Sequence, residues 1–145
     1  MNEKELLEVP IKDEYHYLFS YGGLSPFFKE LSENKRFMGA KCPRCDTIWF
    51  PPRVNCSKCY CPNEWVRVGS EGEVVCSVIV PAPAAKFREL GAPLFAAMIK
   101  LDGCDSCFKA IVIPKGAEEV QKGARVKPVF KEKIESIADF YFEPI

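Results

Sequence analysis

The 145-residue sequence contains one histidine, His16, and its twenty basic and twenty acidic side chains cancel to a formal charge of zero. With one histidine and no serine motif, few residues are available to build a catalytic acid, base or nucleophile. A protein that grips phosphate backbones usually carries a basic excess, so the balance argues against nucleic acid as the main partner. A P-loop, a dinucleotide-binding glycine motif and a zinc-protease motif are also missing. These absences favour a binding or structural protein over a free-standing enzyme.

Membrane and export signals are missing as well. No apolar run approaches the length of about eighteen residues that a membrane-spanning helix needs. The first residues, MNEKELLEVPIKDEYHYLF, are acidic and lack the apolar core and cleavage site of a secretion signal. We therefore expect a cytoplasmic protein in a reducing environment, where closely spaced cysteines more often bind metal than form disulfides.

Cysteine, by contrast, is abundant: five of the eight lie within KCPRCDTIWFPPRVNCSKCYC, residues 41–61. Cys42 with Cys45, and Cys56 with Cys59, form two C-x-x-C pairs with ten residues between them. Each pair can place two thiolates on one side of a tight turn, and two pairs complete the tetrahedral set that Zn²⁺ prefers. Four cysteine ligands leave no position open for water or substrate, so the predicted zinc is structural.

Alternatives for the cysteines stay open. Iron is the closest competitor of zinc, because four thiolates at this spacing also suit a rubredoxin-type centre. Cys61 follows the second pair and could replace Cys59 as a ligand, although the C-x-x-C register favours Cys59. Cys76 is expected to be a small buried hydrophobe. Cys104 and Cys107 form a third C-x-x-C with no further ligand nearby in sequence, and we expect them to mark a hairpin tip.

The residues before the cysteine cluster predict an arm and one helix. Residues 1–11 are expected to be loosely held, and an aromatic run (15–21) follows them. The segment SPFFKELSENKRFMG predicts a short helix with Ser25 as its N-cap, Pro26 at the first helical position and Asn34 as its stop. The aromatic run is suited either to core packing or to docking a partner.

After the cysteine cluster, the sequence changes to short runs rich in valine, isoleucine and phenylalanine, separated by glycine, proline and aspartate. These runs are EWVRVGS, GEVVCSVIV, PLFAAMIKLD, CFKAIVI, ARVKPVFKE and DFYFEPI. Such a series predicts a small closed barrel of the OB-fold type. We therefore expect a mainly β protein with an N-terminal arm and helix (1–36), a rubredoxin-like zinc ribbon (37–63) and a five- to six-stranded OB-fold barrel (64–145).

Candidate contact residues lie beside the cysteines and in the long loop PAPAAKFRELGAP (81–93). Long irregular loops in compact domains are often functional, and binding surfaces need aromatic anchors and arginines. The candidates are Trp49, Phe50 and Arg53 near the predicted metal site, and Lys86, Phe87 and Arg88 in the loop. The two loop charges are equally well explained as solvated surface charges.

The order of these parts resembles a known family. The motifs CPRC (42–45), FPPR (50–53), CSKC (56–59) and GSEGEVV (69–75) carry the resemblance. The sequence is similar to the acyl-CoA-associated family of small proteins with a rubredoxin-like zinc ribbon and an OB fold, long catalogued as a domain of unknown function. The match covers roughly residues 24–143, and the third C-x-x-C is not part of the family pattern.

That resemblance implies a function. Members of the family accompany thiolase-superfamily enzymes as non-catalytic partners, so the chain is expected to be an accessory subunit in a hetero-oligomer. The catalytic cysteine would lie on the other subunit, and contact with CoA or an acyl-CoA is an expectation of the same kind. Two other functions stay open: a nucleic-acid-binding module of zinc ribbon and OB fold, which would need a basic groove with stacking aromatics, and an iron electron carrier.

Overall fold

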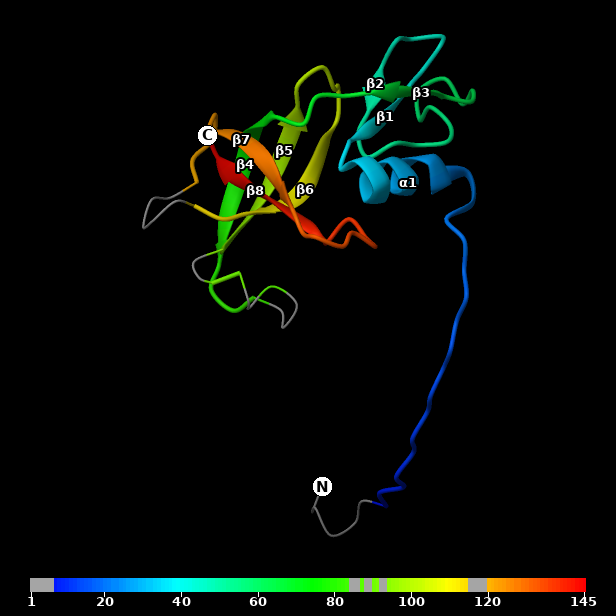
Figure 1. Ribbon diagram of the computed structural model, residues 1–145, viewed down its shortest axis with the longest axis vertical. Coiled ribbons are helices and arrows are strands. Elements are labelled where there is room, and N and C mark those ends of the chain that lie inside the picture. Colours follow the sequence, from blue (N-terminus) through cyan, green and yellow to red (C-terminus); the bar gives the residue numbers. More distant parts are fainter. Residues whose placement is uncertain (1–6, 84–86, 88–89, 92–93, 115–119) are drawn as a thin grey trace.

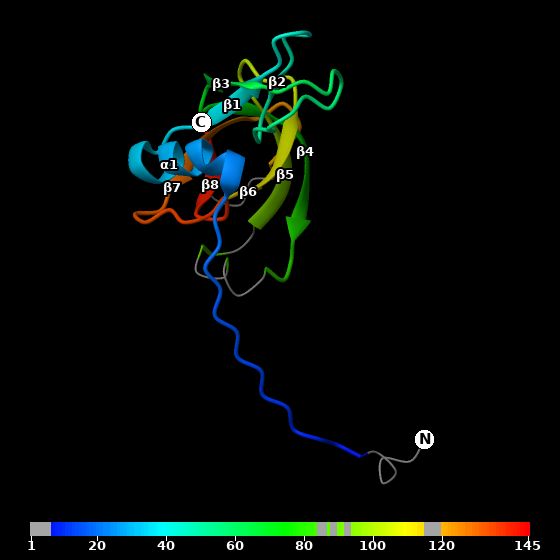
Figure 2. The ribbon, with the colours of Figure 1, turned by 90° about the vertical axis from the view of Figure 1, so that its right-hand side faces the viewer.

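The computed structural model describes residues 7–83, 87, 90–91, 94–114 and 120–145. An extended arm (residues 7–21) leads into a 3₁₀ turn, η2 (Gly22–Leu24), and into the helix α1 (Ser25–Asn34). The other elements described in these ranges are strands, so the predicted mainly β class is confirmed. In Figures 1 and 2 the arm points away from the rest of the chain. No helix in the described ranges is long and apolar enough to cross a membrane.

The helix forms where it was predicted and ends at its predicted last residue. The N-cap position falls one residue before Ser25, whose Oγ donates a hydrogen bond to the Gly22 carbonyl at 2.7 Å. Beyond the helix, Lys35 adopts a left-handed conformation with φ of 50°, which ends the helical hydrogen bonding. Phe27 and Leu31 are buried and attach the helix to the core.

Three short antiparallel strands form the ribbon sheet in the order β2-β1-β3. They are β1 (Met38–Lys41), β2 (Ile48–Trp49) and β3 (Glu64–Arg67). We expected the run that contains β3 to begin the barrel, but β3 pairs with β1 along all four of its residues. The composition of a run predicts a strand and not its partner, which a long-range contact decides. Residues 64–67 therefore belong to the ribbon sheet.

Five strands form the closed barrel in the order β4-β5-β6-β8-β7 (Figure 2). They are β4 (Gly72–Val80), β5 (Leu94–Leu101), β6 (Cys107–Val112), β7 (Arg125–Phe130) and β8 (Phe140–Pro144). All neighbours are antiparallel except β6 and β8, which pair in parallel at Val112 and Phe142. Gly72 lies where β4 pairs with both β5 and β7, and a Cβ there would meet the Lys100 carbonyl oxygen at 2.5 Å. The predicted barrel of five to six strands is confirmed, and it has five.

One hydrophobic core runs through the helix, the ribbon and the barrel. The Phe37 ring, between helix and ribbon, lies 5.1 Å from the Phe50 ring and 5.1 Å from the Phe140 ring of β8. The Phe50 ring lies 4.7 Å from that of Phe108 in β6. Because aromatic side chains bury large areas, these contacts hold the ribbon firmly against the barrel.

The turn between β5 and β6 adds polar contacts at this junction. Ser106 Oγ accepts a hydrogen bond from the Phe50 N–H at 2.7 Å and lies 2.8 Å from the Phe50 carbonyl oxygen. Asp105 Oδ2 accepts from the Ile48 N–H at 2.8 Å, and the Asp105 N–H donates to the Ile48 carbonyl at 2.9 Å. Both residues lie between the cysteines of the third C-x-x-C, at the expected hairpin tip. That tip joins the barrel to β2.

Candidate metal centre and contact surfaces

The four predicted ligands lie together at the end of the ribbon sheet. The Sγ atoms of Cys42, Cys45, Cys56 and Cys59 all lie within 4.8 Å of one another, and those of Cys45 and Cys56 are 3.8 Å apart. Four thiolates around one ion, each at about 2.3 Å, are separated by about 3.8 Å. The cysteines are therefore positioned to bind a metal ion.

Each C-x-x-C pair directs a backbone N–H at the sulfur of its first cysteine. The Arg44 N–H lies 3.4 Å from Cys42 Sγ, and the Lys58 N–H lies 3.4 Å from Cys56 Sγ. Donors aimed at a sulfur favour the negative thiolate, which is the form that binds metal. Both of these sulfurs belong to buried residues, so the backbone donors act where water cannot.

A tight turn follows each pair and closes in the same way. Asp46 and Tyr60, the residues after the second cysteines, both have φ of 57°. Their N–H groups donate to the carbonyl oxygens of Cys42 and Cys56 at 3.0 Å and 2.9 Å. A left-handed conformation is uncommon for a residue other than glycine, and more so for tyrosine than for aspartate. The two halves of the cluster are thus near copies of one local structure.

The thiols of the cluster differ in acidity. Burial raises the pKa of Cys42 to about 12. The hydrogen bond with the Thr47 hydroxyl, 3.2 Å from Cys45 Sγ, lowers the pKa of Cys45 to about 6. Lys58 supports this arrangement, because its Nζ donates to Thr47 Oγ1 at 3.1 Å. An incoming cation would therefore find one thiol readily ionised and would have to displace the proton of a buried one.

The candidate contact residues near the cluster separate into surface and core. The Arg53 guanidinium lies 5.0 Å from the centre of the Trp49 ring, and Lys58 Nζ lies 5.8 Å from it. Trp49 Nε1 is buried and has no hydrogen-bond partner within the described part of the chain. Phe50 is only 2% exposed, so its side chain is a core residue. Trp49 and Arg53 remain as surface candidates.

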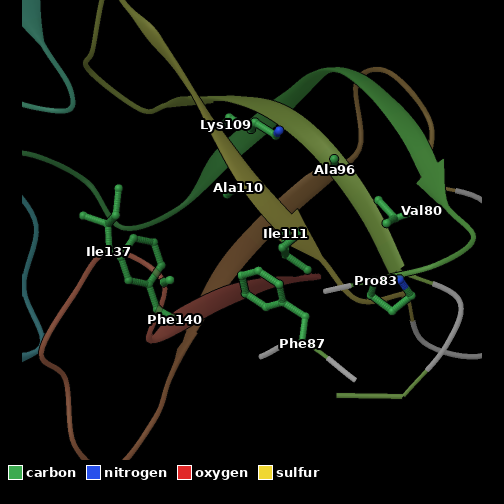
Figure 3. A pocket seen from close by; sticks show the side chains of 10 residues that line it. Val80, Pro83, Phe87, Ala96, Lys109, Ala110, Ile111, Ile137 and Phe140 are labelled. Carbon is green, nitrogen blue, oxygen red and sulfur yellow. The ribbon is translucent and has the colours of Figure 1, made fainter. Parts of the chain in front are cut away.

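An apolar groove lies beside β6. A cavity of about 340 Å³ is lined by Phe87, by Lys109 and Ile111 of β6, and by Ile137 and Phe140. Figure 3 shows Ile137 and Phe140 at one end, Phe87 next to Ile111 in the middle, and Val80 and Pro83 at the other end. β6 and β8 pair at Val112 and Phe142, and the groove lies beside the part of β6 that precedes this pair. Lys86 and Arg88 lie outside the described residues.

A second cavity extends this groove toward the ribbon. It measures about 300 Å³ and shares Lys109, Ile137 and Phe140 with the first. Its far end is formed by Phe50 and Pro51. The apolar surface therefore runs along β6 from the 81–93 loop to the ribbon, on the face where OB folds commonly bind their ligands.

The remaining predicted residues have structural explanations. His16 is exposed and contacts Glu14 at 3.2 Å. Cys76 was expected to be buried but is exposed, because a bulge between Val74 and Cys76 breaks the alternation of inward and outward side chains. Cys104 is buried in the core, which raises the pKa of its thiol to about 11 and makes it unreactive.

No family model matches the chain. It is 32% identical over 107 residues to a DUF35 domain-containing scaffold protein of Methanocaldococcus jannaschii, which covers 72% of this chain and 74% of that protein. The chain belongs to the DUF35 family. A second DUF35 scaffold protein, from Methanothermobacter thermautotrophicus, is 21% identical over 125 residues, 81% of this chain and 92% of that protein.

Two solved structures share the fold of this DUF35 protein. The Ltp2-ChsH2(DUF35) aldolase aligns with a TM-score of 0.64 at 17% identity, over 88% of this chain and 98% of that one. A DUF35 protein of unknown function from Sulfolobus solfataricus aligns with a TM-score of 0.58 at 24% identity, over 74% and 78% of the two chains. At these identities the alignments establish the fold.

Proposed function

We propose that this DUF35 protein is a non-catalytic accessory subunit of a thiolase-superfamily enzyme that acts on acyl-CoA thioesters. The observation that carries the proposal is the uncovered apolar arm. Tyr15, Tyr17, Leu18 and Phe19 are all more than two-thirds exposed. A cluster of large apolar side chains in water usually marks a docking surface. The relatives named scaffold proteins, and the aldolase that contains a DUF35 chain, support a role beside a catalytic partner.

The arm is anchored at its base and uncovered beyond it. The Tyr21 ring stacks on Phe28 of α1 with centres 3.5 Å apart, and its hydroxyl donates to the Glu135 carbonyl at 3.3 Å. We propose that residues before Tyr21 and the adjoining helix clasp the catalytic subunit. Burial of four large side chains at about 1.5–3 kcal/mol each would contribute roughly 6–12 kcal/mol, which is of the same order as the cost of association, so the helix and further contacts would have to add to it.

We propose that the ion is Zn²⁺ and that its role is structural. When bound, it would hold the two C-x-x-C turns together; with four thiolate ligands it would have no position for substrate. Metal analysis of the purified protein tests this, and colour is a second test, because an oxidised iron–thiolate centre is red and a zinc centre is colourless. A reducing cytoplasm would keep the thiols available for the ion.

The groove and the long loop are the proposed contact with the acyl-CoA site of the partner. Phe87 lines the groove, and Lys86 and Arg88 flank it in the sequence. Trp49 and Arg53 present a cation and an aromatic face at the ribbon end. The candidate pathway is benzoylsuccinyl-CoA thiolysis in anaerobic toluene degradation. Alanine at both 86 and 88 should weaken CoA-ester binding by the complex; unchanged affinity would remove the phosphate role.

The first experiment is affinity purification of the tagged protein from its own cells, with mass spectrometry of what accompanies it. A thiolase-like partner in stoichiometric amount supports the proposal. Recovery of the chain alone, or with RNA, contradicts it. The double variant Tyr17→Ser/Phe19→Ser should lose the partner, whereas Val78→Ser, at an exposed position on β4, should retain it.

A further inference from the structure

Cys61 is a fifth thiol beside the four predicted ligands. The two C-x-x-C turns have the same local structure, and this similarity shows which position Cys61 occupies. In the first half of the cluster, the Cys42 N–H donates to the Thr47 carbonyl at 3.0 Å. In the second half, the Cys56 N–H donates to the Cys61 carbonyl at 2.9 Å. Cys61 therefore occupies in the second half the position that Thr47 occupies in the first.

Both residues direct a hydrogen-bonding group at a ligand sulfur. Thr47 Oγ1 lies 3.2 Å from Cys45 Sγ. Cys61 Sγ lies 3.6 Å from Cys42 Sγ, within the range of a hydrogen bond between sulfur atoms. Thr47 and Cys61 thus place a hydroxyl and a thiol beside the two sulfurs of the first pair, Cys45 and Cys42.

The other four cysteines already form a complete ligand set, so we do not expect Cys61 to be a ligand. Cys42, Cys45, Cys56 and Cys59 already lie within 4.8 Å of one another. A tetrahedral ion takes four thiolates, so Cys61 is not needed among its ligands. Cys42 is completely buried, and no water can solvate its sulfur. The backbone N–H groups of Arg44, at 3.4 Å, and of Cys45 also face this sulfur.

We propose that Cys61 is a positioning residue of the metal centre, donating an S–H···S hydrogen bond to the buried Cys42 thiolate. The bond orients the Cys42 side chain and withdraws electron density from its sulfur, as groups around a metal site do when they hydrogen-bond to its ligands. This inference rests on the proposal that the four cysteines hold a metal ion. It does not depend on the partner enzyme.

Cobalt substitution tests the bond. Wild type, Cys61→Ser and Cys61→Val are loaded with Co²⁺ and compared by absorption spectroscopy and competitive metal titration. Cys61→Val removes the donor at similar volume, so the sulfur-to-cobalt charge-transfer bands should move to lower energy, with the ligand-field bands of a four-thiolate site retained. Metal affinity should fall about tenfold, the low end for loss of such a hydrogen bond. Cys61→Ser keeps a donor and should resemble wild type.

The control is Cys76→Val, the same substitution at an exposed thiol on β4, which should change neither spectrum nor affinity. Equal spectra for wild type and Cys61→Val would overturn the proposal, and loss of the four-thiolate bands would make Cys61 a ligand instead. A wild type that binds no Co²⁺ would instead remove the metal proposal beneath it.

A second measurement needs no variant. In wild type loaded with ¹¹³Cd, scalar coupling from the metal should reach the β-protons of the four predicted ligands. Coupling to the β-protons of Cys61 would overturn the proposal, and its absence supports it. This experiment keeps the proposal open to refutation even where Cys61→Val fails to fold.

Discussion

Two residues form strand β2 in the ribbon, whereas nine form β4 in the barrel. The barrel strands supply fully buried side chains from every side of one interior, among them Val74, Leu94 and Phe142. The buried phenylalanines of the ribbon, Phe37 and Phe50, instead pack against rings of the barrel. Hydrophobic burial therefore stabilises the barrel from within, and the ribbon only along the face that it presents to the barrel.

The ribbon and the barrel therefore depend on different sources of stability. A strand of two residues has too few backbone hydrogen bonds to persist without support. Where β1 ends and β2 begins, the ribbon has the four-cysteine cluster in place of an apolar core. We infer that the metal orders this part of the ribbon, and that aromatic packing with the β5–β6 turn orders the face toward the barrel. Three perturbations test this division.

Removal of the metal should have the largest effect. Binding energies of order 10 kcal/mol are typical of structural zinc, so a chelator, or Cys56→Ser, should unfold the ribbon and leave the barrel. The two tryptophans of the chain, Trp49 and Trp65, both lie in the ribbon sheet. Their fluorescence should therefore move to longer wavelength, while hydrogen exchange in β4 and β5 stays slow.

The matched control is Cys76→Ser, which removes an exposed thiol of the barrel and should leave the emission unchanged. Tryptophan emission that survives complete loss of the metal would mean that packing alone orders the ribbon. Simultaneous loss of protection in both parts would mean that they unfold as one unit.

Ser106→Ala should have an intermediate effect. The change removes the Ser106 hydroxyl, which is the hydrogen-bond partner of the N–H and the carbonyl of buried Phe50. Unsatisfied buried groups cost about 1–3 kcal/mol, so we expect a loss near 2 kcal/mol in urea unfolding. Amide exchange at Phe50 should accelerate more than exchange within β4. Ser32→Ala, on the exposed side of α1, is the control and should cost less than about 0.5 kcal/mol.

The smallest effect is expected for Asp102→Asn, within the barrel. The Arg125 guanidinium donates to both carboxylate oxygens, at 2.7 Å and 2.5 Å, and holds the pKa of Asp102 below its usual value. A lowered folded pKa contributes stability above the unfolded pKa, and that contribution is lost as the pH falls through the folded pKa. Both side chains are about half exposed, so the contribution is small and weakened by salt.

Thermal unfolding of wild type and Asp102→Asn checks this at neutral and acidic pH. The variant should melt slightly lower at pH 7, and the difference should disappear at a pH below the folded pKa. A difference that persists in acid would show that packing rather than charge is involved. Tryptophan emission at room temperature should be the same in both proteins, because the pair lies outside the ribbon.

Local patterns in the sequence predicted much of this architecture. The C-x-x-C spacing fixed the four cysteines that lie together, because each pair is set by a turn of a few residues. The helix was also predictable, apart from the position of its cap. The barrel was predicted from the series of short apolar runs. The first run contains β3 of the ribbon sheet, and each of the others contains a barrel strand.

The remaining features, which are the burial of Phe50, the exposure of Cys76 and the groove, depend on long-range contacts that no local sequence pattern encodes. Phe50 follows Trp49 in an aromatic pair, and only the packing of Phe37 and Phe108 against it makes it a core residue. The bulge before Cys76 reverses a side chain that simple alternation would bury. The groove combines residues of β6 with Phe87 and Phe140, which the closed barrel brings together. The one available signal for it was the length of the 81–93 loop.

The turn between β5 and β6 has an evolutionary consequence. Asp105 and Ser106 bond to main-chain atoms of Ile48 and Phe50, which every amino acid except proline supplies in full. These bonds therefore do not depend on the side chains at positions 48 and 50. Position 50 is constrained instead by the packing of its ring against Phe37 and Phe108. Drift at position 50 is thus limited by packing, and drift at positions 105 and 106 by hydrogen bonding.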